Sequence, residues 1–225
     1  MTGPNQDTEA LRALRGLASD DPSVRLRAAL AIGTAPDPRC VDPLVERCAV
    51  EPDFQVREML TWALLRHEPS LTVPKLIAEL RAERTQARSQ ALHTLSKIGD
   101  RRAWPAITRE LLTDADDEVA RTAWRAAVAL VPEGEELGLA EVLATQLGRG
   151  ERETQLSLSR ALVALGEPVV PLLDAATASP DPQVRRHAAA TERLLRDPDA
   201  GFDASIEQAQ RIVALGSLGA LDPQG

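Results

Sequence analysis

Apolar residues recur along the chain at spacings of three and four positions, the spacing that places them on one face of an α-helix. In "DDPSVRLRAALAIG" the group is Ala28, Ala31 and Ile32. Much the same stretch returns from Glu51 as "EPDFQVREMLTWAL" and from Ser179 as "SPDPQVRRHAAATE". Each copy opens with the Asp and Pro residues typical of a turn, and then predicts one amphipathic helix.

The repeat has a nearly constant length. Six anchor residues, one in each copy, are separated by 32, 31, 32, 35 and 30 positions: Val24, Val56, Ala87, Val119, Thr154 and Val184. A period of ~20–50 residues is typical of a solenoid, in which each repeat packs on its neighbours. The longest spacing contains "VPEGEELG", which we expect to form a loop.

A second helix follows the first in each repeat. The segments "CVDPLVERC", "TVPKLIAEL" and "AWPAITREL" align, and each carries a proline in its first turn, where the missing N–H costs nothing. Gly33, Gly99 and Gly166 stand where three first helices are expected to end. Each repeat is therefore predicted to be a helical hairpin that buries its apolar face only against a neighbour.

The fold class that follows is all-α: an α-solenoid of five to six short helical hairpins with terminal capping helices. We expect an N-terminal capping helix in residues 1–18, the repeats in residues 19–200, and a C-terminal capping helix and tail in residues 201–225. Asp7 and Asp203 are the predicted N-caps of the two terminal helices.

The composition indicates which residues fill the core and which class of partner is disfavoured. Hydrophobic residues make up 44% of the 225 residues but aromatic residues only 2%, so Ala and Leu, which favour helices, must fill the core. The net charge of −8 argues against nucleic acid, whose non-specific binding needs clustered Lys and Arg. Cys40 and Cys48 are interpreted as small hydrophobic residues in a reducing compartment. With no signal peptide and no apolar run of ~18 residues, we expect a cytoplasmic protein without membrane association.

Charged residues recur at fixed positions too. In most repeats an acid lies three residues before the anchor, and an arginine lies one residue after it. We predict that these side chains reach between stacked repeats and form a ladder of charge-assisted hydrogen bonds. The residues of this predicted ladder are Asp21, Arg25, Asp53, Arg57, Arg88, Asp116, Asp181 and Arg185.

The pattern "DDPSVRLRAALAIG" followed by "VDPLVE" resembles HEAT repeats, specifically the short class called PBS-lyase HEAT-like repeats. The resemblance covers roughly Ser19 to Leu195 and implies the solenoid fold. It implies no single function, because the class includes scaffolds, regulators, lyase subunits and hydroxylases.

Enzymes of this class set a test for catalytic residues. Deoxyhypusine hydroxylase holds two irons with several His-Glu pairs, whereas here His67-Glu68 is the single pair, and His93 and His187 lack an adjacent Glu. The sequence also lacks the basic, aromatic groove implied for HEAT-like DNA glycosylases, a poised Cys for a bilin lyase, and a phosphate-binding loop. We therefore predict no catalytic residue, metal or cofactor. A HEAT-type enzyme, either a lyase or a metal-dependent hydroxylase, remains an alternative.

The resemblance implies that the second helices line the concave face of the solenoid. Trp62 falls at a partly exposed position of a first helix and is a candidate hot spot, whereas Trp104 is expected in the core and Trp124 half-buried. We predict a non-enzymatic scaffold or adaptor that binds a protein or peptide partner on the concave face; a ligand-sensing or regulatory module associated with a transcriptional regulator is a further alternative. The predicted partner-binding residues are Glu46, Arg47, Trp62, Glu79, Arg109 and Glu110.

Overall fold

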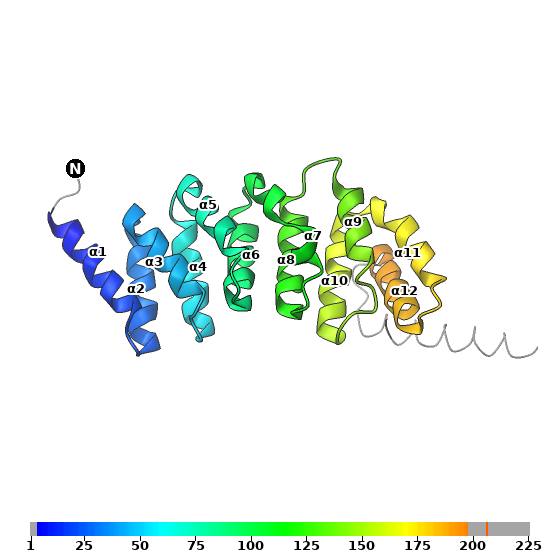
Figure 1. Ribbon diagram of the computed structural model, residues 1–225, viewed down its shortest axis with the longest axis horizontal. Coiled ribbons are helices and arrows are strands. Elements are labelled where there is room, and N and C mark those ends of the chain that lie inside the picture. The colour runs from blue at the N-terminus through cyan, green and yellow to red at the C-terminus, as the bar shows by residue number, and fades with distance from the viewer. Residues whose placement is uncertain (1–3, 198–205, 207–225) are drawn as a thin grey trace, which may run out of the picture. The chain divides into compact units, whose positions relative to one another are not determined.

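The computed structural model describes residues 4–197 and residue 206. Within these residues the chain forms twelve α-helices and three 3₁₀-helices and contains no strand (Figure 1). The predicted all-α fold of stacked helical pairs is confirmed. Internal contacts divide the chain into two compact units, Met1–Ile107 and Thr108–Gly225.

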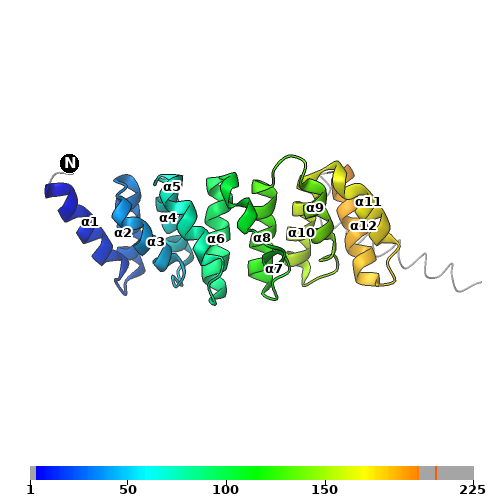
Figure 2. The same cartoon turned by 45° about the horizontal axis from the view of Figure 1, so that its top comes forward.

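In the first unit, the first helices of successive repeats lie side by side, each in contact with the one before it (Figure 2). These helices are α1 (Pro4–Leu17), α2 (Pro22–Thr34), α4 (Phe54–Leu65) and α6 (Thr85–Ile98). The second helices form another row against them: α3 (Val41–Cys48), which follows the 3₁₀-helix η1 (Pro38–Cys40), then α5 (Pro69–Glu79) and the 3₁₀-helix η2 (Arg101–Ala106).

The second unit repeats this arrangement. Its first helices are α8 (Asp117–Leu130), α10 (Arg152–Leu165) and α12 (Pro182–Arg196), and α10 contacts both of the others. Its second-helix row consists of α7 (Arg109–Leu112), α9 (Glu136–Ala144), the 3₁₀-helix η3 (Glu167–Val169) and α11 (Val170–Thr177). Only the first part of the predicted loop "VPEGEELG" lies between α8 and α9, with Gly134 at φ 90°, because α9 begins at Glu136 and includes the last three residues of that segment.

The repeat register explains the core and one gap in it. The position seven residues after the anchor is buried in five repeats, by Ala63, Thr94, Ala126, Ala161 and Thr191. In the first repeat the same position is Ala31, and it is exposed. Although α1 packs on α2, it therefore leaves uncovered a part of α2 that the corresponding neighbours cover elsewhere.

Two predicted helix ends are confirmed and one is wrong. Gly99 ends α6 in the left-handed conformation at φ 71°, and Gly166 follows α10 at φ 73°. In contrast, α2 continues through Gly33 to Thr34, and Gly33 is buried. The reason is contact rather than capping, because a Cβ on Gly33 would lie 2.2 Å from Cζ3 of Trp62.

The segment "AWPAITREL" does not form one continuous second helix. It is divided into η2 and the single turn α7, with Thr108 in an extended conformation at φ −80° and ψ 161° between them. Pro105 lies inside η2, but the aligned Pro74 lies inside the continuous helix α5, so the proline alone does not account for the division.

The ends of the chain are described in part. Helix α1 begins at Pro4, so Asp7 lies inside it and the predicted N-cap there is wrong. Asp203 lies outside the described residues, whereas Ile206 packs against the buried pair Ala190 and Leu194. The predicted domain boundaries stay a prediction. Among the described residues no single helix has the length and apolarity to cross a membrane, although Arg152–Leu165 and Glu167–Thr177, bent by 118°, pass that test as a pair.

Candidate functional site

Three predicted partner-binding residues of the first unit, Glu46, Arg47 and Glu79, lie on the neighbouring second helices α3 and α5, but they differ in exposure. Glu46 on α3 is exposed, and Glu79 at the end of α5 is half-buried. Arg47 donates from Nε to Oε2 of Glu51 at 2.8 Å, and its side chain is only 22% exposed. Its guanidinium is therefore held within the molecule, and a contact with a partner at this surface stays a prediction.

Arg109 and Glu110 belong to the second unit. Both are exposed and both lie on the single turn α7. The helical hairpin that was expected to present them is interrupted at Thr108, so their predicted alignment with a regular second helix is wrong. Their role in binding stays a prediction.

The three tryptophans occupy different environments. Trp62 is 37% exposed, as predicted, and lies over Gly33, where α4 approaches α2. Trp124 was predicted to be half-buried but is fully buried, and its indole N–H donates to the carbonyl of Leu112 at 2.8 Å. Trp104 is half-buried in η2 rather than in the core. Trp62 therefore has a structural role beside its predicted role in binding.

The predicted ladder between repeats is wrong in its partners. Each of its four aspartates precedes a first helix in extended conformation and accepts a hydrogen bond from a backbone N–H of that same helix, as an N-cap does. None of the four is hydrogen-bonded to a ladder arginine within the part of the chain that the structure describes. These capping residues are Asp21, Asp53, Asp116 and Asp181.

The ladder arginines also act inside their own repeats. Each folds back over the preceding turn and donates from Nη1 to the carbonyls five and six residues earlier; Arg57, for example, binds Pro52 and Glu51 at 2.8 and 3.0 Å. The recurring Asp and Arg thus fix the turn before each first helix. The other members with this bonding are Arg25, Arg88 and Arg185.

The buried charged hydrogen bond between repeats joins a ladder arginine to an acid that the periodic pattern did not identify. Arg25 on α2 donates from Nε and Nη2 to the two carboxylate oxygens of Glu51, both at 2.7 Å. Glu51 is fully buried and also accepts from Arg47 and from the N–H of Asp53. Burial alone would raise the pKa of Glu51, but the bonds from Arg25 and Arg47 hold it at about 2. In the second unit, Arg149 binds Oδ1 of Asp117 from Nε at 2.9 Å and from Nη2 at 2.8 Å, but the side chain of Asp117 is 44% exposed.

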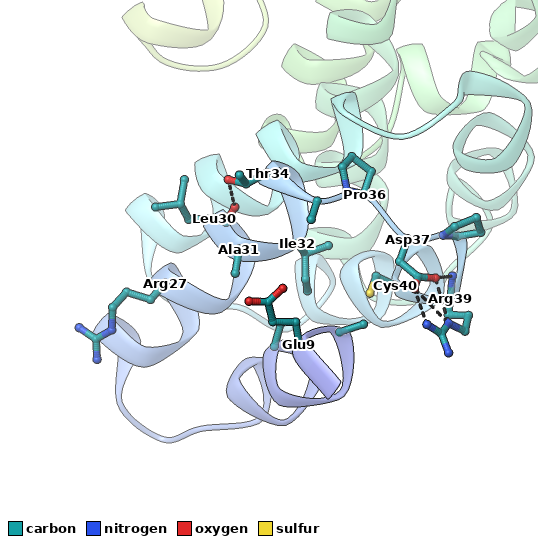
Figure 3. Close-up of a pocket in the computed structure, with 14 residues that line it drawn as sticks. Glu9, Arg27, Leu30, Ala31, Ile32, Thr34, Pro36, Asp37, Arg39 and Cys40 are labelled. Carbon is teal, nitrogen blue, oxygen red and sulfur yellow. Dashed lines mark hydrogen bonds and ion pairs between the residues drawn. The ribbon is translucent and has the colours of Figure 1, made fainter. Parts of the chain in front are cut away.

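A groove opens where Ala31 is uncovered. It has a volume of about 830 Å³ and lies between α1 on one side and α2, η1 and the turn between them on the other (Figure 3). Ala10 and Ala13 face it from α1, whereas Leu30 and Ala31 face it from α2. Leu30 is 45% exposed, so the groove presents an apolar surface to solvent.

Charged residues border the groove. Glu9 of α1 points toward Ala31 between the two helices, and Arg27 lies at one end (Figure 3). At the other end Asp37 caps η1 and pairs with Arg39 at 2.6 Å, which lowers the pKa of Asp37. Asp37 and Arg39 neutralise each other. Glu9 and Arg27 are the other charged residues at this groove, and neither forms an ion pair among the described residues.

The cysteines do not supply a nucleophile at the groove. Cys40 lines it, but the side chain is buried, and burial raises the pKa of its thiol. Cys48 is also buried, and burial raises its pKa to about 12. Both are free thiols. Since the thiolate is the reactive form, neither environment activates cysteine chemistry.

A buried polar cluster in the second unit was not predicted from the sequence. Nδ1 of His187 accepts from the N–H of Gly148 at 3.0 Å, so Nε2 carries the proton, and it lies 3.0 Å from both Ser159 Oγ and the Gln155 carbonyl. Ser159 in turn lies 2.7 Å from Thr191 Oγ1. Burial lowers the pKa of His187 to about 4. With His187 and Ser159 fully buried, this cluster joins α10 to α12 and has no access to a substrate.

The histidines do not assemble a metal site. His67 is buried, with Nδ1 2.8 Å from the carbonyl of Ala63 and Nε2 3.1 Å from that of Asp37. His93 pairs with Glu58 at 3.2 Å. Across the described ranges 4–197 and 206, no group of three or more His, Cys, Asp or Glu residues is arranged to hold a metal ion.

Comparison with known proteins gives one sequence match and several structural likenesses. A family model described as HEAT repeats matches residues 3–65. No curated protein matches the sequence. The crystal structure of an engineered protein is similar over 89% of this chain and 97% of its own, with 22% identity and a TM-score of 0.49. Human deoxyhypusine hydroxylase in complex with glycerol is similar over 93% of this chain and 98% of its own, with 19% identity and a TM-score of 0.47. At these values neither likeness indicates a shared activity.

Proposed function

We propose that this chain, which matches a family model of HEAT repeats over residues 3–65, is a non-enzymatic binding module whose groove between α1 and α2 holds an amphipathic helix of a protein partner. The observation that carries the proposal is the exposure of Ala31 at a position that is buried in the other five repeats. The groove is thus a helix-packing surface that α1 covers only in part. An added helix is the element that this surface fits.

The side chains around the groove favour a particular kind of helix. Small residues, Ala10, Ala13 and Ala31, allow a close approach of the partner's backbone, and Leu30 supplies apolar area. The exposed carboxylate of Glu9 between the walls favours a Lys or Arg at the edge of the apolar face of that helix. The occupant is therefore expected to be an apolar helix with basic flanking residues.

A non-enzymatic role is supported by the state of the reactive side chains. The thiols of Cys40 and Cys48 are buried with raised pKa values, and the Ser159–His187 pair is sealed inside the second unit. The groove itself presents alanines, a leucine and charged side chains, a set suited to binding.

A second candidate, sensing of a small apolar ligand, is favoured by the size of the same groove. Its volume of about 830 Å³ falls in the range of roughly 300–1,000 Å³ that is usual for ligand sites. The exposed Leu30 favours the helix instead, because it leaves apolar surface of the groove in contact with solvent.

The experiment is site-directed photo-crosslinking in cells, with a photoreactive amino acid placed at Ala31, at Glu46 or Glu79 on the second helices, or, as a control, at the exposed Ala129 of α8. The proposal predicts a specific protein adduct at Ala31 that is missing at Ala129. The cross-linked peptide of that partner should have an amphipathic helical sequence.

Binding of the purified partner should then be measured with two matched variants. Ala31→Arg places a long charged side chain in the groove and should weaken binding at least ~tenfold, whereas Ala129→Arg should leave it unchanged. Equal effects of both variants, or an adduct only when the photoreactive residue stands at Glu46 or Glu79, would remove the groove from the proposal. Stabilisation by small apolar molecules in the absence of any protein adduct would favour the second candidate.

A further inference from the structure

The second unit carries a basic groove that is independent of the site proposed above. It lies between α8 and α10 and has a volume of about 340 Å³. Arg121 and Arg125 border it from α8, four residues apart and so on the same face, and Arg160 borders it from α10. Glu153 is the one acidic residue among the side chains that line it. The groove is therefore locally positive, whereas the whole chain has a net charge of −8.

The three arginines differ in whether an acidic side chain of this chain pairs with them. Arg121 lies 3.2 Å from Glu153 and 3.8 Å from Glu118, so its charge is balanced within the molecule. Arg125 donates to the neutral hydroxyl of Thr122 at 3.2 Å, and it is exposed. Arg160 is exposed as well, and neither Arg125 nor Arg160 forms an ion pair within the described part of the chain. Two solvated guanidiniums thus face one groove from opposite walls.

Between these arginines the surface is apolar. Val128 on α8 and Leu156 on α10 are half-buried and line the groove, together with the small residues Ala161 and Ala164. An occupant that matches both parts needs carboxylates for the guanidiniums and an apolar side chain for the space between them. A polyphosphate matches the arginines only, and Glu153 with Glu118 repels it from the end of the groove where both helices begin.

We propose that the groove between α8 and α10 is a docking site for an acidic, partly apolar peptide segment of a partner protein, bound through the guanidiniums of Arg125 and Arg160. The carboxylates of the segment pair with the two guanidiniums, and a Leu-like side chain between them covers Val128 and Leu156. Because Arg presents a planar fork of donors, it fits a carboxylate better than Lys would at the same position.

Fluorescence anisotropy with the 225-residue chain tests this proposal. The probe is a labelled 16-residue peptide of alternating Glu and Leu or Ala, and the competitors are the same peptide with Lys in place of Glu, an all-Glu peptide, a phosphoserine peptide and a single-stranded DNA oligonucleotide. The Glu/Leu peptide should bind with an affinity that falls as salt rises. It should bind at least ~fivefold more tightly than the all-Glu peptide, which lacks the apolar contact.

Matched variants assign the binding to this groove. The double variant Arg125→Glu/Arg160→Glu should weaken binding of the Glu/Leu peptide at least ~tenfold, because each attraction becomes a repulsion. Arg66→Glu/Arg81→Glu makes the same change of charge at exposed positions of the first unit and should weaken it less than ~twofold. Circular dichroism melting checks that both variants stay folded.

Three results would overturn the proposal. These are no binding of the Glu/Leu peptide at low salt, equal losses in the two double variants, and tighter binding of the phosphoserine peptide or the oligonucleotide than of the Glu/Leu peptide.

Discussion

At the scale of single residues, the buried acid that joins the first two repeats, Glu51, is not one of the residues that recur. The repeating Asp and Arg residues hold their own turns, whereas Glu51 gathers Arg25, Arg47 and the N–H of Asp53 around one buried carboxylate. Sequence periodicity identifies what every repeat shares. It does not identify Glu51, because the position that forms this bond is occupied by other residue types elsewhere.

Replacing Glu51 by Gln should strongly destabilise the protein. The amide keeps the size of the side chain but leaves the guanidinium of Arg25, 6% exposed, without its counter-charge. Loss of one partner of a buried ion pair costs about 3 kcal/mol. Urea unfolding measures the change, and Asp100→Asn serves as the control because its partner Arg102 is 65% exposed. An effect of Glu51→Gln no larger than that of the control would contradict the role assigned to Glu51.

His187 should make stability depend on pH below neutrality. Its pKa is lowered from 6.5 to about 4 in the folded protein, chiefly by burial, so the unfolded chain takes up a proton first as the pH falls. The contribution of His187 to the free energy of unfolding is therefore fully present above pH 6.5. It declines between pH 6.5 and pH 4, by about 3 kcal/mol in all. Glu51 acts in a lower range, between 4.5 and about 2.

Unfolding free energies of the wild type and His187→Asn across pH 7 to 4 measure this dependence. The variant has no imidazole to protonate, so its stability should change much less over the range. A wild-type profile that is flat between pH 6.5 and 4, or one that is the same in both proteins, would show that His187 does not have the lowered pKa.

At the scale of helices, the apolar period predicted most first helices and their turns, because each such helix buries one face against its neighbours. It failed where tertiary contact decided the outcome. Gly33 has the sequence context of a helix end but instead lies against the ring of Trp62, and the predicted second helix "AWPAITREL" is divided at Thr108 into η2 and α7. A pattern of single residues shows neither the contact of Gly33 with Trp62 nor the division of the helix at Thr108.

Gly33→Ala should therefore destabilise the protein by about 1–2 kcal/mol, although Ala favours a helix over Gly. Its Cβ would meet Cζ3 of Trp62 at 2.2 Å and the backbone Cα of Ala63 at 3.0 Å. Gly138→Ala in α9 is the matched control, since nothing lies within 4 Å of a Cβ there. That change should be neutral or stabilising.

Thermal melting of both variants, and of Gly33→Ala combined with Trp62→Leu, tests the contact. The smaller leucine should restore part of the stability lost in Gly33→Ala, so the two changes should not be additive. If Gly33→Ala melts at or above the temperature of the wild type, the close approach of α2 and α4 has another basis.

At the scale of the whole molecule, the sequence was sufficient to predict an all-α chain of stacked hairpins, because the repeated pattern has no other way to bury its apolar faces. It did not predict the groove between α1 and α2. Ala31 has the same residue type and register as the buried Ala63 and Ala126, and only the course of α1 over α2 leaves it exposed. Two candidate binding surfaces therefore remain: the predicted second-helix surface around Glu46 and Glu79, and the groove at Ala31. The periodic pattern could not identify the groove, because it does not distinguish an exposed Ala31 from a buried one.

Hydrogen exchange of the protein with and without the partner identified by cross-linking tests the central claim most directly. Docking of a helix in the groove should slow exchange of the amides in Glu9–Ala13 of α1 and Arg27–Thr34 of α2, while the amides of α5 stay unchanged. Protection confined to α3 and α5, with none in α1 and α2, would contradict the claim and assign the partner to the second-helix surface instead.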